Sequence, residues 1–300
     1  MIFMSDIKIF DTNGIVKELT STKVHLEKEL QNLIETNMEI FFNIKFLKSE
    51  YAITNGRMDS IGIDENYSPV IFEYKRSSNE NVINQGLFYL DWLLDHKADF
   101  TLLVLNTFGK DMADKIDWSV PCVICIANDF TKYDIHAVNQ MQRNIKLVKY
   151  RKLDNGLIMF EHLNNPVINQ LETGDITSTN EKKTPKNHIE KIKDSPNNIK
   201  TLYYEICNYI ESLGDDISSN QLKYYIAYRT TQNIACIEVL KKQISIYLKL
   251  NPENIDLEEG FTKNMSGIGH FGTGDLQVSI KNIDDFMKAK PLIEKAYNES

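Results

Sequence analysis

Long apolar segments are missing from this chain of 300 residues. A membrane-spanning helix needs about 20 consecutive apolar residues, and the sequence has no run that approaches this length. The first residues, MIFMSDIKIF, also lack the positively charged start and the long apolar stretch of a secretory signal. We therefore expect no membrane partner and a cytoplasmic location.

Positive charge is scarce as well. The chain has 34 Lys and Arg residues against 42 Asp and Glu residues, which gives a formal net charge of −8. Proteins that coat nucleic acids nonspecifically depend on many Lys and Arg contacts to phosphates, so this class is excluded. Any affinity for nucleic acid must come from a local arrangement of residues.

Cysteine is rare, with 4 residues in the chain. Cys122 and Cys125 form a C-x-x-C pattern, which occurs in redox and zinc sites. However, they lie within the apolar run VPCVICIA, with no second cysteine pair and no turn between them. We therefore expect two buried strand residues and no disulfide framework.

Polar residues stand out in the stretch from Gly56 to Gln85. The pattern predicts a β-hairpin with strands at 57–64 and 70–76, joined by a turn at 65–69. Because side chains alternate across a strand, Glu73 and Lys75 share one face of an otherwise apolar strand. Burying a carboxylate and an amine there costs free energy, which favours a functional role for the pair.

Asp59 lies on the first strand of this hairpin, where pairing brings its carboxylate beside Glu73. Two adjacent carboxylates resist joint ionisation unless a cation lies between them, and oxygen ligands suit Mg²⁺ or Mn²⁺. A metal site of this kind can catalyse the hydrolysis of a phosphodiester bond. The simpler alternative is that Asp59 caps the hairpin while Glu73 and Lys75 form a solvated ion pair on an edge strand.

Taken in order, Asp59, then E-Y-K at positions 73–75, then Gln85 in the string QGLFYL, resembles the PD-(D/E)XK nuclease superfamily, and most of all its NucS/EndoMS branch. The resemblance covers about the first 165 residues. It implies a restriction-endonuclease-like fold. It also implies a metal site formed by Asp59, Glu73 and the backbone carbonyl of Tyr74, with Lys75 orienting the attacking water.

The same resemblance assigns two helical residues to the site. Gln85 would brace it from a helix at 80–96, whose face with Gln85 and Tyr89 is expected to lie against the hairpin. Tyr89 itself is interpreted as core packing. A glutamate from the preceding helix would support the metal; the sequence offers Glu27, with Glu29 as the second choice.

Alternating helix and strand patterns predict the α/β class, with a mixed sheet flanked by helices. The expected elements are helices at 22–37, 80–96 and 132–141, and strands at 40–53, 99–106, 121–127, 145–153 and 156–163. Residues 172–198 are rich in Thr, Asn, Lys and Pro and are interpreted as a linker. They divide a nuclease-like domain, 1–171, from a small α+β domain, 199–300, whose pattern indicates no activity.

These observations predict a divalent-metal-dependent endonuclease with Mg²⁺ or Mn²⁺ as cofactor and DNA, rather than RNA, as partner. A homodimer is left open. The alternative is a catalytically silent nuclease-fold module that binds nucleic acid or a partner protein; the intact Asp, Glu and Lys set argues against it and the acidic balance argues for it.

Overall fold

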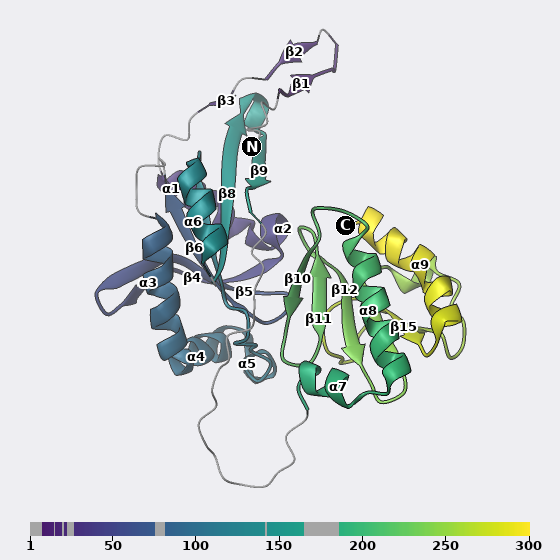
Figure 1. Cartoon of the computed structure of the whole chain (residues 1–300). Coiled ribbons are helices and arrows are strands. Elements are labelled where there is room, and N and C mark those ends of the chain that lie inside the picture. Colours follow the sequence, from purple (N-terminus) through teal and green to yellow (C-terminus); the bar gives the residue numbers. More distant parts are fainter. Residues whose placement is uncertain are drawn as a thin grey trace.

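The structure is a computed structural model that describes residues 8–14, 16–19, 21–22, 27–75, 82–141, 143–164 and 186–300. Two separate sheets dominate this part of the chain, each with its own helices (Figure 1). A short two-stranded ribbon, β1 (Phe10–Asp11) with β2 (Lys17–Glu18), stands apart from both.

Within the described residues, the N-terminal sheet has seven strands: six in the order β3-β8-β7-β6-β5-β4, with β9 also paired to β8. Their bounds are β3 (Ser21–Thr22), β4 (Ile44–Ile53), β5 (Gly56–Asp64), β6 (Pro69–Lys75), β7 (Cys122–Ala127), β8 (Asn144–Leu153) and β9 (Ile158–His162). The central strands β6, β7 and β8 run parallel, and the other pairs are antiparallel. The sheet is therefore mixed, and its predicted hairpin is β5–β6.

Helices cover both faces of this sheet. One face carries Ile61, Ile71 and Val123 and packs against α3 (Val82–Asp95), α4 (Lys97–Phe108) and α6 (Lys132–Gln140). The other face carries Phe72 and Ile124 and packs against α1 (Glu27–Thr36) and α2 (Met38–Phe42). The short helix α5 (Lys110–Ala113) follows α4. The predicted fold class, a mixed sheet flanked by helices and followed by a small α+β unit, is confirmed.

One strand prediction in this region was wrong, and another was right except for its start. Residues 99–106 lie inside helix α4, where Phe100 and Val104 are buried and Leu102 and Leu105 are exposed. Burial four residues apart is the helical period, but a short apolar run fits a buried strand equally well, so the pattern was ambiguous. The predicted strand at 40–53 begins at Ile44, because α2 continues to Phe42.

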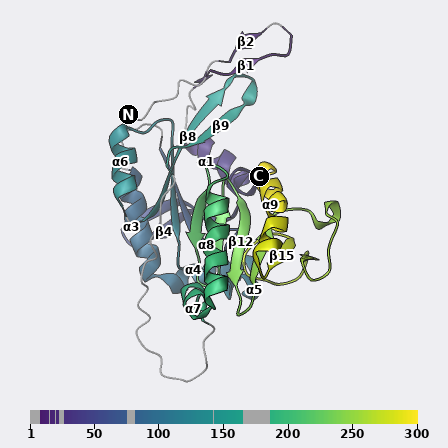
Figure 2. The same ribbon diagram turned by 45° about the vertical axis from the view of Figure 1, so that its right-hand side comes forward.

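The C-terminal sheet is antiparallel, with six strands among the described residues in the order β10-β11-β12-β13-β15-β14. Their bounds are β10 (Ser218–Gln221), β11 (Ile226–Arg229), β12 (Asn233–Val239), β13 (Ile244–Leu248), β14 (Thr262–Asn264) and β15 (Leu276–Ile280). Helices α8 (Asn197–Glu211) and α9 (Ile283–Asn298) lie side by side over one face (Figures 1 and 2). No described helix is both long and apolar enough to span a bilayer.

Part of the segment predicted as a linker is helical. Residues 172–185 lie outside the described residues, whereas His188–Asp194 form α7. A capping box starts this helix: the Asn187 side chain accepts from the Glu190 N–H, and the Glu190 carboxylate accepts from the Asn187 N–H. The polar composition that favoured a linker thus includes the signals of a helix start.

The second face of the C-terminal sheet docks on the N-terminal domain. Val120 from the N-terminal domain is buried in one cluster with Leu222, Tyr225 and Met265. Beside it, the Asn233 side-chain amide donates to Asn66 Oδ1 at 2.6 Å, and the Tyr225 hydroxyl donates to the same oxygen at 3.0 Å. These contacts fix how the two sheets sit against each other.

Candidate active site

The hairpin β5–β6 brings two carboxylates together through its backbone. The Asp59 N–H donates to Glu73 Oε1 at 3.2 Å, and the Tyr74 N–H donates to Asp59 Oδ2 at 3.0 Å. The two strands pair antiparallel with Ser60 opposite Phe72, so these reciprocal bonds follow directly from the register. Glu73 is 2% exposed, which makes it one of the few buried acidic residues of the sheet. The solvated edge-strand alternative is therefore wrong for Glu73.

Crowding and burial change the acidity of this pair. Burial and the neighbouring Asp59 charge raise the pKa of Glu73 to about 8, against the opposing effects of the Asp59 N–H and Lys75. The pKa of Asp59 is also raised, mainly by burial, although the hydrogen bond from Tyr74 lowers it. Two adjacent carboxylates with raised pKa values, one buried and one half-buried, form a place where a cation would relieve the repulsion.

Lys75 and Glu27 lie near this pair of carboxylates. The Lys75 ammonium lies 3.9 Å from a Glu27 carboxylate oxygen, and the lysine side chain is 13% exposed. Glu29, the second choice from the sequence, instead pairs with Lys152 at 2.7 Å on the exposed side of α1. The structure thus brings together Glu27, Asp59, Glu73 and Lys75, and it leaves Glu29 outside.

Gln85 does not join this group. It lies in the first half of α3, its side chain is exposed, and within the described residues it makes no hydrogen bond to the site. The first turn of α3 does pack on the sheet, because Gly86 fits against Val123 with no room for a side chain. The buried face of α3 therefore runs through Val82 and Gly86 and not through Gln85.

Tyr89 lies where a bracing residue was expected. It is 7% exposed, and its hydroxyl accepts a hydrogen bond from the Arg57 N–H at 3.4 Å. Burial raises its pKa, and the Glu73 and Asp59 carboxylates add to the shift, which places the phenol beside the acidic pair. The prediction that the Tyr89 ring packs in the core is confirmed. Nothing in the sequence indicated that its hydroxyl would also lie beside the site.

Gln31 is a positioning residue that sequence reasoning missed. Its side chain is 3% exposed, and its amide donates to the Asp59 carbonyl at 2.8 Å and to Glu35 at 2.8 Å. The Ser60 hydroxyl donates to the same Glu35 carboxylate at 2.6 Å. A polar residue between Leu30 and Ile34 on the apolar face of α1 was the available signal.

The donor set fits a small divalent cation. Asp59 and Glu73 offer carboxylate oxygens, and Tyr74, which follows Glu73 on β6, offers a main-chain carbonyl. Oxygen ligands of this kind are the ones that Mg²⁺ and Mn²⁺ take together with several waters. In the part of the chain that the structure describes, no group of three or more His, Cys, Asp or Glu side chains is arranged to hold a metal. A metal here would depend on two carboxylates, one main-chain oxygen and water.

The two cysteines of the C-x-x-C pattern have no part in the site chemistry. Cys122 and Cys125 are both buried and free on β7. Burial raises the pKa of Cys122 to about 11 and that of Cys125 further, so neither is a thiolate at neutral pH. The prediction of buried strand residues is confirmed.

Two solved structures resemble part of this chain. A repair endonuclease from Pyrococcus abyssi is 19% identical, with a TM-score of 0.29, and the match covers 43% of this chain and 50% of that one. An EndoMS complex with double-stranded DNA is 16% identical, with a TM-score of 0.26, over 48% of this chain and 64% of that one. Both likenesses are partial in length and in geometry.

Sequence relatives give a firmer result. Residues 189–300 match DUF5655, a domain of unknown function. A Haemophilus influenzae protein described as uncharacterized is 31% identical over 308 residues, and the match covers 98% of this chain and 100% of the relative. At this identity and coverage the chain belongs to the same family as the Haemophilus influenzae protein, with both of its domains included.

Proposed function

We propose that this chain is a divalent-metal-dependent endonuclease that hydrolyses phosphodiester bonds in DNA. The observation that carries the proposal is the pair of the half-buried Asp59 and the buried Glu73. Backbone N–H groups of Asp59 and Tyr74 hold the two carboxylates, and Lys75 lies next along the strand on the same face as Glu73. The sequence likeness of Asp59 and E-Y-K at 73–75 to the PD-(D/E)XK nucleases supports the same reading. A structural role for this pair is costly, because Glu73 is buried, Asp59 is half-buried, and the Asp59 charge opposes ionisation of Glu73.

In this proposal Asp59, Glu73 and the Tyr74 carbonyl hold Mg²⁺ or Mn²⁺, which supplies charge neutralisation at the scissile phosphate. Lys75 orients the attacking water with its ammonium, and Glu27 keeps that ammonium in position through their ion pair. Gln31 fixes the Asp59 backbone, so the carboxylate stays aligned with Glu73. Gln85 has no contact that supports a bracing role, and Tyr89 takes its place.

A second candidate is a catalytically silent module that binds nucleic acid or a partner protein. Two observations favour it: the described residues hold no larger group of metal-ligating side chains, and the formal net charge is −8. Such a module has no reason to bind a divalent cation at Asp59 and Glu73. Metal binding therefore separates the two candidates.

The test is a cleavage assay on the purified chain with labelled single-stranded, double-stranded and mismatched DNA and the matching RNAs. Each substrate is incubated with Mg²⁺, Mn²⁺ or EDTA. We expect cleavage of at least one DNA form with a metal and none with EDTA. Calorimetric titration with Mn²⁺ is run in parallel, because it reports metal binding even if no substrate is cut.

The matched variants are Glu73→Gln and Glu29→Gln. Both replace a carboxyl group by an amide of the same size, but Glu73 lies in the site whereas Glu29 pairs with Lys152 on the exposed side of α1. We expect Glu73→Gln to lose metal binding and cleavage, and Glu29→Gln to keep both. Absence of Mn²⁺ binding in the parent protein would reject the nuclease and leave the silent module.

A further inference from the structure

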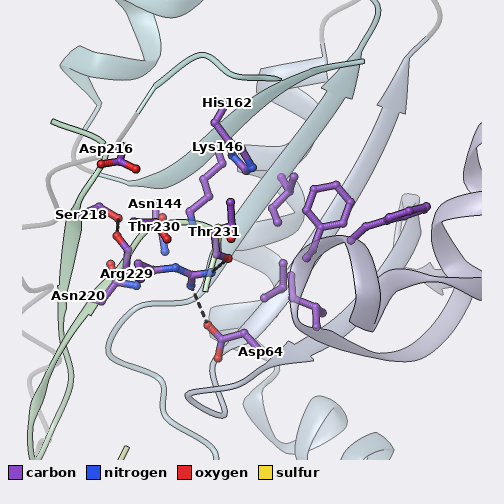
Figure 3. A pocket seen from close by; sticks show the side chains of 16 residues that line it. Asp64, Asn144, Lys146, His162, Asp216, Ser218, Asn220, Arg229, Thr230 and Thr231 are labelled. Atoms are coloured by element: carbon purple, nitrogen blue, oxygen red, sulfur yellow. Dashed lines mark hydrogen bonds and ion pairs between the residues drawn. The ribbon is translucent and has the colours of Figure 1, made fainter. Parts of the chain in front are cut away.

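A cavity of about 180 Å³ lies where the two domains meet (Figure 3). Asn144 and Lys146 reach it from β8 of the N-terminal domain, and Arg229, Thr230 and Thr231 reach it from the end of β11 and the turn that follows in the C-terminal domain. Neither domain forms this cavity by itself. A ligand bound here would touch both.

The cavity is separate from the candidate active site. Val70 and Ile124 line it, and both belong to the sheet face that packs against α1 and α2. Because side chains alternate along β6, Val70 points away from the face that carries Ile71 and Glu73. The cavity and the acidic pair thus lie on opposite faces of the same sheet.

Lys146 brings a positive charge without a close ion-pair partner into this cavity. Its side chain extends from β8 toward Arg229 (Figure 3), and no carboxylate of the described residues lies within ion-pairing distance of its ammonium. Burial and the nearby Arg229 charge lower the pKa of Lys146 to about 8, although Cys122, Asp64 and Glu65 oppose the shift. Lys146 is half-buried, and an ammonium held there without an ion-pair partner is costly, so a bound anion would stabilise it.

Arg229 is a second buried cation with donors to spare. It is 6% exposed, and Nη2 donates to the Thr231 carbonyl at 3.0 Å. Its nearest carboxylates, on Asp64 and Glu65, lie 3.9 Å and 4.0 Å away, which is beyond hydrogen-bond distance. The buried Nε has no partner at all among the described residues. The two carboxylates therefore partly neutralise the charge of the guanidinium, but they do not accept its hydrogen bonds.

The rest of the lining is mixed. Phe41, Phe42 and Ile44 form an apolar wall on the N-terminal side. Across from them, Ser218 adds a hydroxyl, and Asp216 adds a carboxylate that already accepts a hydrogen bond from the Tyr297 hydroxyl at 2.9 Å. Asp64 also lines the cavity, 3.9 Å from Arg229. An occupant that meets the Lys146 and Arg229 cations at one end and the phenylalanine rings at the other is therefore anionic at one end and apolar at the other.

We propose that this cavity binds a small organic phosphate, with its phosphoryl group between Lys146 and Arg229 and its flat apolar part against Phe41 and Phe42. A phosphoryl group has three terminal oxygens, which can accept from the Lys146 ammonium, the Arg229 Nε–H and the threonine hydroxyls together. A carboxylate has two oxygens and leaves more of these donors unpaired. Because the ligand contacts both domains, it also stabilises their docking.

Phenyl phosphate is the probe, since it joins a phosphoryl group to one flat ring. We expect calorimetry to show that it binds the full chain, and melting experiments to show a Tm that rises with its concentration. Phenol lacks the anion and is expected not to bind. Benzoate carries a carboxylate on the same ring and is expected to bind at least about tenfold more weakly. If AMP binds more tightly than phenyl phosphate, the natural ligand is a nucleotide. If AMP binds more weakly, the natural ligand is a smaller organic phosphate.

Lys146→Met is the test variant and Lys48→Met its control. Lys48 is an exposed lysine on β4 and does not line the cavity. We expect Lys146→Met to weaken phenyl phosphate binding at least about tenfold without lowering the Tm, Lys146→Arg to retain binding, and Lys48→Met to bind like the parent. Equal binding by Lys146→Met and the parent overturns the proposal. So does tighter binding of benzoate, or the absence of any binding at millimolar phenyl phosphate, which would make the cavity a water site.

Discussion

The two faces of the N-terminal sheet bury charge of opposite sign. On the α3 side, Asp59 and Glu73 crowd two carboxylates together, with Lys75 as partial compensation. On the side facing the C-terminal domain, Lys146 and Arg229 bring two cations together, with Asp64 as partial compensation. Each group has two charges of one sign and one of the other, so neither is a matched structural ion pair. In our two proposals, the first face therefore binds a cation and the second an anion.

The largest expected effect lies on the acidic face. Lys75→Met should reduce metal-dependent cleavage by about 10² to 10⁴, as the loss of other positioned proton-handling groups does. Lys152→Met is the control, because Lys152 pairs with Glu29 away from the site. Single-turnover rates on the best substrate measure both variants. An unchanged rate for Lys75→Met would reduce the acidic face to a binding surface.

On the basic face, Arg229→Met should destabilise the protein by about 3 kcal/mol, because it leaves the Asp64 carboxylate buried without its cation. Burial raises the pKa of Asp64 from 3.8 to about 6, and Arg229 limits that rise. The contribution of Asp64 to stability is thus fully present below about pH 4 and lost as the pH rises through 6.

Without Arg229 the folded-state pKa of Asp64 is higher still, so the loss continues above pH 6. Among its neighbours, Lys146 and the Ser68 N–H still oppose the rise, and Glu65 adds to it. Urea unfolding of the variant and the parent should show a larger difference at pH 8 than at pH 5. A difference that does not change with pH would mean that Arg229 acts through packing and not through Asp64.

Lys146→Met should have the opposite sign, stabilising the ligand-free protein at pH 7 by about 1 to 3 kcal/mol. The pKa of Lys146 falls from 10.5 to about 8 on folding, mainly because of burial, so the unfolded chain binds its proton more tightly. Stability of the parent therefore rises with pH between about 8 and 10.5 through this group. The advantage of the variant should shrink over the same interval, as urea unfolding at pH 7 and pH 10 can measure. A destabilised variant would show that Lys146 has a partner in the folded protein.

The smallest effect is expected at Gln85. Gln85→Ala should change the cleavage rate by less than about tenfold and the free energy of unfolding by less than about 0.5 kcal/mol, because the side chain is exposed. Tyr89→Phe is the informative comparison, since it removes the hydroxyl that contacts the Arg57 N–H and keeps the ring. If Gln85→Ala abolishes cleavage, the site extends along α3 further than these contacts indicate.

The hairpin could be predicted from the sequence because its signal is local. Alternation fixed the face of Glu73 and Lys75, and a short turn fixed the pairing that brings Asp59 beside them. Glu27 was chosen because the family resemblance implies a glutamate on the preceding helix. Gln85 failed because the buried face of α3 is set by the close approach of Gly86 to Val123, a tertiary contact that the residue types do not reveal.

The interdomain cavity was missed although half of its signal was present. Lys146 interrupts an apolar strand on the same face as the buried Val148 and Tyr150, just as Glu73 interrupts β6. Its partner Arg229 lies on another sheet 83 positions later in the chain, and no periodicity links two such positions. Charge on a buried strand face can be found from sequence, but the surface that completes the site cannot.

The turn between β5 and β6 has a consequence for how the two domains can be inherited. Asn66 lies in that turn and is held by Asn233 and Tyr225, and the neighbouring Glu65 carboxylate accepts from the Asn233 N–H at 2.8 Å. The loop that joins the two strands carrying Asp59 and Glu73 is thus matched to residues of the C-terminal domain. A gene fusion that exchanged either domain for an unrelated one would have to replace this turn as well. We therefore expect the two domains to occur together in related proteins.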